Sequence, residues 1–229
     1  MAVGVRRVRA IHRRLLKRYG DLQPPRASDP LDELILTVLS QHTSDANAER
    51  AFDALRAAYA MWDDVVRART PAVADVIRSG GLANTKAPRI QAILREVHDR
   101  ESGFNLTRLR TLSDDEVRSY LSSLRGVGPK TTAVVMAFAL GRDTIPVDTH
   151  VHRVSSRLGL IPARTSAEKA HRVLDELVPD ELKIPLHVGL IRLGREICAA
   201  GRPLCVTCPL KELCPTAPMF LSAGRAPRR

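Results

Sequence analysis

Apolar residues recur along most of the chain at the three- and four-residue spacing of an amphipathic helix. In the basic N-terminal segment, one helical face would carry Val5, Val8, Ile11, Leu15 and Tyr19. No convincing run shows the alternation of apolar and polar residues that is typical of a half-buried strand. The pattern therefore predicts an all-α fold with short connectors.

Residues that favour helix starts and stops divide this pattern into separate helices. Asp29-Pro30 supplies an N-cap and a first-turn proline for the apolar run that ends at Leu39. Ser44 or Asp45 can cap the next helix. One further helix is expected from Thr70-Pro71 to Gly80-Gly81, and another from a Ser113–Glu116 capping box to Leu124. The remaining expected helices span 86–101, 131–140, 166–177 and 186–199. The tail from residue 222 is expected to be mobile.

Length and composition allow a packed core. The 229 residues are 44% hydrophobic, which suits one large domain or two small lobes. No run of about 18 apolar residues predicts a membrane span. The basic start lacks the apolar stretch of a secretory signal, and although a mitochondrial presequence would also be basic and amphipathic, an ordinary first helix is favoured.

The charge balance points to a polyanionic partner. Net charge is +11, with 30 Arg against 6 Lys, and the pI is about 10.2. An arginine-rich genome that affects every surface is the alternative explanation. Only eight residues are aromatic, which argues against a single-strand binder built from stacking platforms. A nucleic-acid duplex and an acidic membrane surface both remain possible partners.

All four cysteines fall in one short segment, with the spacing Cys198-x6-Cys205-x2-Cys208-x5-Cys214. A disulfide framework would normally be spread over a smaller, cysteine-dense secreted chain, so this cluster indicates an intracellular metal site. Zinc accepts four thiolates, but zinc ribbons often use two CxxC pairs and this segment has one. The uneven spacing favours a 4Fe–4S cluster over zinc.

A glycine-rich connector, Leu124-Arg-Gly-Val-Gly-Pro-Lys130, separates two expected helices. Gly126 and Gly128 permit a tight turn and a close backbone approach. Backbone N–H groups at the start of the next helix can receive a phosphate, and Pro129 suits the first helical turn. The same pattern also occurs as plain turn chemistry between two helices.

Lys130 and Asp148 are candidate catalytic residues. A lysine amine can attack a sugar carbon and form a Schiff base. A nearby carboxylate can assist deprotonation and stabilise an oxocarbenium-like centre. Asp148 also precedes a helix-like segment, so an N-cap is the alternative role for its side chain.

Taken together, these residues resemble the endonuclease III family of DNA glycosylases over roughly residues 30 to 215. The family's L-P-G-V-G-x-K-T-A hairpin appears as LRGVGPKTT, its V-D-T-H as residues 147–150, and its G-L-x-N-x-K-A loop as GLANTKA at 81–87. The cysteine pattern matches the family's in all three gaps. The resemblance identifies the expected cofactor as one 4Fe–4S cluster.

The resemblance implies two helical lobes with a DNA cleft between them. A six-helix lobe with the helix-hairpin-helix would span 30–142, and 1–29 together with 143–229 would form the iron–sulfur lobe. By motif position Lys130 would be the nucleophile and Asp148 the catalytic carboxylate. The residues expected to contact DNA are Gln41, His42, Leu82, Gly126, Val127, Gly128 and Pro129.

Three departures from the family pattern bear on the damaged base. Arg125 replaces the usual proline of the hairpin, and Pro129 replaces a usual basic residue. LSQHTSD stands where the family commonly has LSAQATD, so His42 takes the place of the glutamine that fills the gap left by a flipped base. The loop between Cys198 and Cys205 carries a single cation, Arg202, which is fewer than in many relatives.

The expected function is base excision repair. The chain would remove a damaged pyrimidine, by family default an oxidised one, from duplex DNA and then nick the strand by β-elimination. The alternatives are a glycosylase for uracil, mismatched or methylated bases, and a damage-binding protein with little catalysis. The related adenine glycosylases lack the lysine and carry a further C-terminal domain, so Lys130 and the chain end argue against them. We expect a monomer without membrane contact, in the cytoplasm and on the nucleoid of a bacterium.

Overall fold

The computed structural model describes residues 2–22 and 29–223, and every regular element within them is helical. This confirms the all-α class. The chain divides into two compact units, one comprising Arg26–Arg142 and the other Met1–Pro25 with Asp143–Arg229. The part of the predicted mobile tail beyond residue 223 lies outside the described residues. No helix in the described part of the chain is long and apolar enough to cross a membrane.

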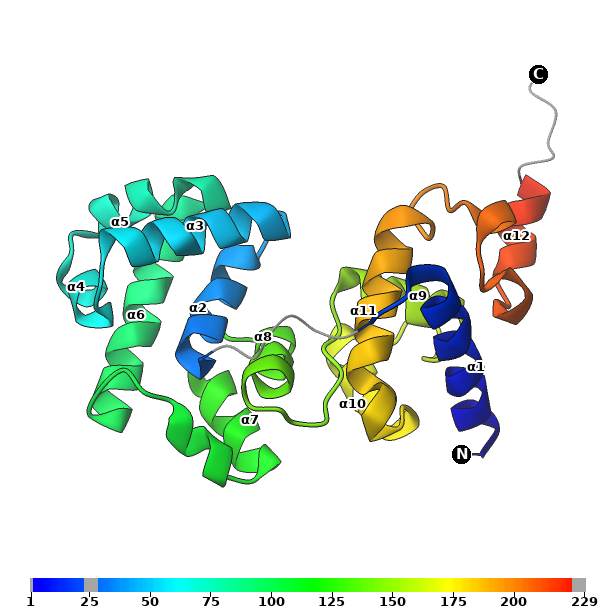
Figure 1. Cartoon of the computed structure of the whole chain (residues 1–229), viewed down its shortest axis with the longest axis horizontal. Helices are drawn as coiled ribbons and strands as arrows, with labels where there is room; N and C mark the ends of the chain where they lie inside the picture. The colour runs from blue at the N-terminus through cyan, green and yellow to red at the C-terminus, as the bar shows by residue number, and fades with distance from the viewer. Residues whose placement is uncertain (1, 23–28, 224–229) are drawn as a thin grey trace, which may run out of the picture. The chain divides into compact units, whose positions relative to one another are not determined.

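The unit Arg26–Arg142 is built from short helices around one apolar core (Figure 1). The long helix α6 runs through it, and its residues Ile90 and Leu94 are fully buried with Leu34 and Ile35 of α2. Its helices are α2 (Pro30–Ser40), α3 (Asp45–Ala58), α4 (Trp62–Arg67), α5 (Thr70–Val76), α6 (Ala83–Glu101), α7 (Asp114–Ser123) and α8 (Pro129–Val134). Two 3₁₀ turns, η1 (Arg78–Gly80) and η2 (Thr107–Thr111), and a π-helical segment, η3 (Val135–Ala139), complete it.

Several helices of this unit begin where capping residues predict. Asp29 accepts a hydrogen bond from the Leu31 amide at 2.9 Å, which satisfies an amide that the first turn of α2 leaves without a partner. Of the two candidates for capping α3, Ser44 does so, by accepting from the Asn47 amide at 3.3 Å. The capping box that opens α7 is present as predicted.

Other helix boundaries differ from the prediction. The helix predicted over 86–101 begins at Ala83, directly after the left-handed Leu82. The segment predicted as one α-helix over 131–140 begins at Pro129 and becomes π-helical at Val135, where wider turns place the Leu140 amide 3.1 Å from the Val135 carbonyl.

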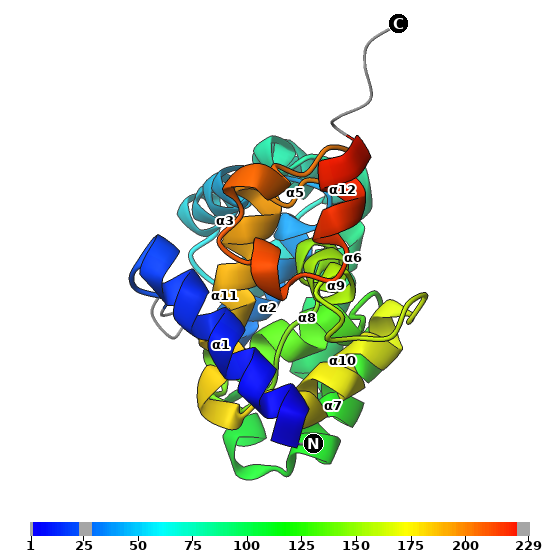
Figure 2. The same cartoon turned by 90° about the vertical axis from the view of Figure 1, so that its right-hand side faces the viewer.

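The second unit packs α1 and α9 against the long helix α11, and Figure 2 shows α1 along α11. Gly189 of α11 permits this contact, since a Cβ there would lie 3.0 Å from Leu15 Cδ1. The predicted helix over 186–199 begins at Asp180 and ends at Glu196, with Pro185 tolerated inside it. The elements are α1 (Ala2–Tyr19), α9 (Thr149–Arg157), α10 (Ala167–Leu177), α11 (Asp180–Glu196), η4 (Cys205–Thr207), η5 (Lys211–Leu213) and the unpredicted α12 (Ala217–Ala223).

Candidate functional site

The connector between α7 and α8 is a tight hairpin turn. The Val127 amide donates to the Leu124 carbonyl at 3.0 Å, and Gly126, the third residue of this turn, has a φ of +82° that favours glycine. Val127 is buried in the core, so its side chain anchors the turn from inside. Gly128 is different, because its φ of −97° suits any residue and a Cβ there would meet nothing within 4 Å. The backbone at Gly128 is therefore open to approach from outside.

Lys130 is the second residue of α8 and is half-buried. Within the described residues its ammonium has no hydrogen bond or ion pair. The next two residues, Thr131 and Thr132, are buried, which fixes the helix turn that carries the lysine. The first turn of α8 has no side-chain cap. The hairpin thus presents an amine without an internal partner beside uncapped backbone amides.

Gln41 and His42 lie in the loop between α2 and α3. The Gln41 side-chain oxygen accepts from Arg89 Nη1 at 2.8 Å, so this predicted DNA contact has an internal partner. His42 is exposed and has a left-handed φ of 56°. Ser44, and not His42, caps α3. The imidazole is free to act outside the protein.

Leu82 has the same two properties as His42. Its φ is 49° and its side chain is 57% exposed, which is unusual for a large apolar residue. A left-handed backbone costs a non-glycine residue about 1–2 kcal/mol. Such strain persists only where the surroundings impose it, and it concentrates at functional sites. Both predicted duplex-penetrating residues are therefore held in conformations that they do not favour.

Arg89 of α6 is a residue of this site that sequence reasoning missed. Besides binding Gln41, it lies across the hairpin, where a Cβ on Gly126 would be 2.8 Å from Arg89 Cδ. Arg89 therefore connects the Gln41 loop to the hairpin turn. In the sequence it was one of several cations on a basic amphipathic helix, and nothing in the pattern distinguished it from the others.

Asp148 lies in the other unit and is the N-cap of α9. Its Oδ1 accepts from the Val151 amide at 2.7 Å, which confirms the capping role considered from the sequence. The carboxylate is half-buried, and no hydrogen bond occupies Oδ2 among the contacts of the described residues. Capping one oxygen fixes the orientation of the carboxylate and leaves the second oxygen for chemistry.

The segment before Asp148 is held by polar side chains that the sequence did not single out. Asp175 accepts from the Ile145 amide at 2.7 Å, and His187 Nδ1 lies 2.8 Å from the Pro146 carbonyl oxygen. Both come from helices that follow Asp148 in the chain, so no local motif could reveal them. These two contacts hold the backbone just before residues 147–150, the VDTH segment.

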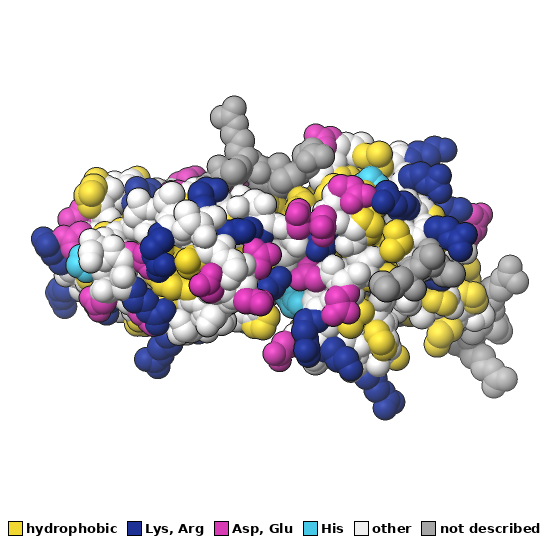
Figure 3. Space-filling model, turned by 90° about the horizontal axis from the view of Figure 1, so that it is seen from below, with side chains coloured by type: hydrophobic (Ala, Val, Ile, Leu, Met, Phe, Trp, Pro, Cys, Tyr) yellow, Lys and Arg dark blue, Asp and Glu magenta, His cyan; other side chains and the backbone are white. Residues whose placement is uncertain are grey.

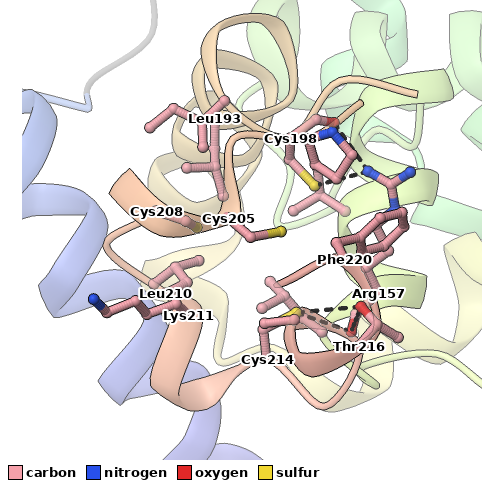
Figure 4. A pocket seen from close by; sticks show the side chains of 15 residues that line it. Arg157, Leu193, Cys198, Cys205, Cys208, Leu210, Lys211, Cys214, Thr216 and Phe220 are labelled. Carbon is pink, nitrogen blue, oxygen red and sulfur yellow. Dashed lines mark hydrogen bonds between the residues drawn. The ribbon is translucent and has the colours of Figure 1, made fainter. Parts of the chain in front are cut away.

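The four cysteines come from separate turns and line one pocket, together with Leu193, Leu210 and Phe220 (Figure 4). Cys198 follows α11, Cys205 begins η4, Cys208 follows it, and Cys214 follows η5. Figure 4 shows the sulfur atoms of Cys198, Cys205 and Cys214 around a common space. Distant turns thus bring all four thiols to one place.

The electrostatics of this pocket favour a cationic group among the thiols. Burial, and then the neighbouring Cys198 and Cys214, raise the pKa of Cys205. Burial also raises the pKa of Cys208. Crowded thiolates repel one another unless a metal-containing group supplies positive charge, and a coordinating thiol loses its proton to such a group.

Four thiols are the donors that this pocket offers to a metal ion or cluster. No three His, Cys, Asp or Glu residues in the described ranges converge closely enough to hold a single ion. A zinc ion requires four sulfur atoms about 2.3 Å from one point. A 4Fe–4S cluster takes one thiolate at each of its four corners, so the four cysteines match either group in number.

Arg157 of α9 connects several parts of the cysteine segment. Its Nη1 donates to Cys198 Sγ at 3.2 Å and to the Ala199 carbonyl at 2.7 Å, and its guanidinium lies 4.8 Å from the centre of the Phe220 ring. On the other side, Arg14 of α1 donates to the Pro209 carbonyl at 3.1 Å. The segment is thereby attached to two helices of its unit.

Comparison with known protein families identifies the chain's relatives. Residues 35–180 match the family described as HhH-GPD superfamily base excision DNA repair protein. This chain belongs to the HhH-GPD superfamily. The match contains the hairpin, Lys130 and Asp148, and it ends before the cysteine segment.

Individual HhH-GPD proteins support a narrower placement. Endonuclease III of Thermotoga maritima is 33% identical over 207 residues, which cover 90% of this chain and 92% of that protein. A provisionally named DNA glycosylase of Arabidopsis thaliana is 40% identical over 169 residues, 74% of this chain but 57% of that longer protein. A trapped endonuclease III–DNA covalent intermediate superposes with a TM-score of 0.81 at 31% identity, covering 94% of this chain and 98% of that one. The predicted resemblance and the enzyme class, a bifunctional DNA glycosylase and AP lyase, are confirmed.

Proposed function

We propose that the chain excises an oxidised pyrimidine from duplex DNA and then cleaves the strand at the resulting abasic site, as a monomer on the bacterial nucleoid. The observation that carries this proposal is the amine of Lys130, which lacks a polar partner in the described residues and stands at the start of α8 beside the Gly126–Gly128 turn. The related endonuclease III trapped as a covalent intermediate with DNA supports it.

In this mechanism Lys130 acts as the nucleophile. Its amine nitrogen forms a bond to C1′ as the glycosidic bond breaks, and the base leaves with a proton. Opening of the sugar ring gives a Schiff base, which acidifies C2′. Loss of a C2′ proton and departure of the 3′ phosphate then nick the strand by β-elimination.

Asp148 supplies the carboxylate. The bond from the Val151 amide holds one oxygen at 2.7 Å, and the second can receive a proton from the lysine or face the developing positive charge on the sugar. Fixing the carboxylate in advance avoids reorganisation during the reaction. This assigns the residue both a structural and a chemical role.

DNA is held by the hairpin and opened by the two strained loops. The backbone of Gly126, Val127, Gly128 and Pro129 would approach a phosphate, with the N-terminus of the helix favouring its charge. His42 would stack in the space left by the flipped nucleotide, and Leu82 would wedge the duplex. Gln41 would support His42 through Arg89 more than it contacts DNA itself, because its side-chain oxygen accepts from that guanidinium.

Cys198, Cys205, Cys208 and Cys214 would hold one 4Fe–4S cluster, whose four corners each take one thiolate. The cluster would supply a rigid crosslink for the segment between α11 and α12, since no substrate redox step is required. Protein purified without oxygen should contain about four irons per chain and be yellow-brown. Stoichiometric zinc in such protein would contradict the assignment.

Borohydride trapping tests the proposed reaction directly. Wild-type protein should form a covalent adduct with abasic duplex after reduction, and Lys130→Ala should not, because no amine then forms the Schiff base. Asp148→Asn should lose more activity than binding, since the carboxylate acts in the transition state. An adduct that persists in Lys130→Ala would place the nucleophile elsewhere, and a wild type that binds damage without turnover would indicate a damage-binding protein.

Base release measured on a panel of duplexes, each with one lesion, identifies the damaged base that the protein prefers. Oxidised pyrimidines should be released faster than uracil, mismatched thymine or methylated bases. Faster release of any of the last three would reassign the substrate and leave the lysine chemistry intact.

A further inference from the structure

Lys86 of α6 is buried and has no role in the chemistry described so far. Its side chain is 2% exposed. Its Nζ donates to the Leu39 carbonyl at 2.6 Å and to the Gly80 carbonyl at 2.8 Å. Charge-assisted bonds to two carbonyls offset the desolvation of the ammonium. Burial, with a smaller contribution from Arg89, lowers the pKa of Lys86.

The two carbonyls belong to the helical turns that lead into the two strained residues. Leu39 lies in the last turn of α2, where carbonyls lose their helical partners, and His42 follows three residues later. Gly80 ends η1, and Leu82 follows two residues later. The two turns lie close together, since a Cβ added to Gly80 would be 3.8 Å from the Leu39 oxygen. One ammonium thus bonds to both.

We propose that Lys86 is a positioning residue for base extrusion, which holds the His42 and Leu82 loops together so that both side chains enter the duplex as one rigid unit. The inference rests on the proposed function. It also assigns a reason to the left-handed backbones, because strain at two adjacent loops persists only if both are fixed from within. The buried amine bonds to carbonyls and so does not compete with Lys130 for the sugar.

The test replaces the ammonium while keeping the length and bulk of the side chain. Lys86→Met removes both donors and leaves two buried carbonyls without partners. Lys183→Met is the control, because Lys183 is also buried at 6% exposure, donates to the Asp143 carbonyl at 2.8 Å, pairs with Asp180 Oδ1 at 2.7 Å and lies in the other unit. Lys86→Gln, which retains an N–H donor, serves if the methionine variant does not fold.

Three measurements are made on each variant that unfolds cooperatively on heating. They are release of an oxidised pyrimidine from a duplex, strand cleavage at a preformed abasic site, and fluorescence of 2-aminopurine placed beside the lesion. Lys86→Met should lower base release about ten- to a hundredfold, the loss that misplacement of about 1 Å produces in a positioned site. Abasic cleavage should fall much less, and the fluorescence rise that reports unstacking should shrink. Lys86→Gln should recover part of both signals.

Lys183→Met should lower thermal stability without changing the ratio of base release to abasic cleavage. An equal ratio in Lys86→Met and Lys183→Met, with wild-type trapping intact, would overturn the role of Lys86 alone. Failure of wild-type protein to form a borohydride adduct with abasic duplex would instead overturn the proposed function.

Discussion

Replacing Gly128 with alanine should affect the stability of the protein and the binding of DNA by the hairpin differently. Gly128 precedes α8, with φ of −97° and ψ of 179°, an extended backbone that alanine adopts without strain. An added Cβ would meet nothing within 4 Å. The folded protein therefore has room for the methyl group, and only a molecule that approaches from outside would meet it.

The effect on stability should be small, because Gly128 is the N-cap of α8, where alanine is less favourable than glycine, and a gain from the unfolded state opposes that loss. Alanine restricts the unfolded chain more than glycine does, which stabilises a protein by about 0.4–1 kcal/mol where the native backbone is compatible. Gly141→Ala is the control, because its φ of +67° is left-handed although a Cβ there also meets nothing within 4 Å. That variant should lose about 1–2 kcal/mol from backbone strain alone.

The effect on DNA binding should be large. If a phosphate lies against the backbone at Gly128, the methyl group displaces it and removes a hydrogen bond to a charged group, worth about 1.5–3 kcal/mol. That corresponds to a loss of affinity of roughly tenfold to somewhat over a hundredfold. Gly141→Ala should bind with the wild-type affinity at temperatures where it remains folded.

Urea unfolding and fluorescence anisotropy with an abasic duplex measure the two quantities on the same preparations. A Gly128→Ala protein that is about as stable as wild type and binds DNA more weakly supports the phosphate contact. Wild-type affinity in that variant would refute the phosphate contact, since the new methyl group would displace a phosphate bound against this backbone.

Three further predictions concern the duplex. His42→Ala should depress release of a damaged base far more than cleavage at a preformed abasic site, which is already flexible; equal loss on both removes His42 from extrusion. Leu82→Gly should lower base release but change the free energy of unfolding by less than about 1 kcal/mol. The left-handed backbone suits glycine, and the lost side chain is 57% exposed. Binding should weaken with salt at a log–log slope of roughly −0.9 per phosphate contacted, and a flat response contradicts a duplex contact.

The net positive charge by itself does not locate a binding surface. Net charge is +11, yet the face in Figure 3 shows Lys and Arg in several groups with Asp and Glu between them. The sequence total therefore predicts attraction to a polyanion without locating it. Salt dependence of the variants, rather than of wild type alone, is needed to locate the phosphate contacts.

Local chemistry explains what was predictable from sequence. The helices were predictable from apolar periodicity and from caps such as Asp29 and Ser113, because a capping side chain bonds to a backbone amide only a few residues away. The glycine requirement of the hairpin and the grouping of four cysteines are equally local. Boundaries were less predictable where tertiary packing decided them, as at Pro185 inside α11.

The sequence by itself determined the helical class, the hairpin and the identity of the candidate nucleophile, carboxylate and thiols, since each follows from residue type and short spacing. Only the tertiary structure decided which side chains hold them. Lys86 reaches Leu39 and Arg89 reaches Gln41 across 47 and 48 residues. A cation that satisfies a distant carbonyl looks, in a sequence, like any other cation on a helix, because its partner is selected by packing and burial rather than by spacing.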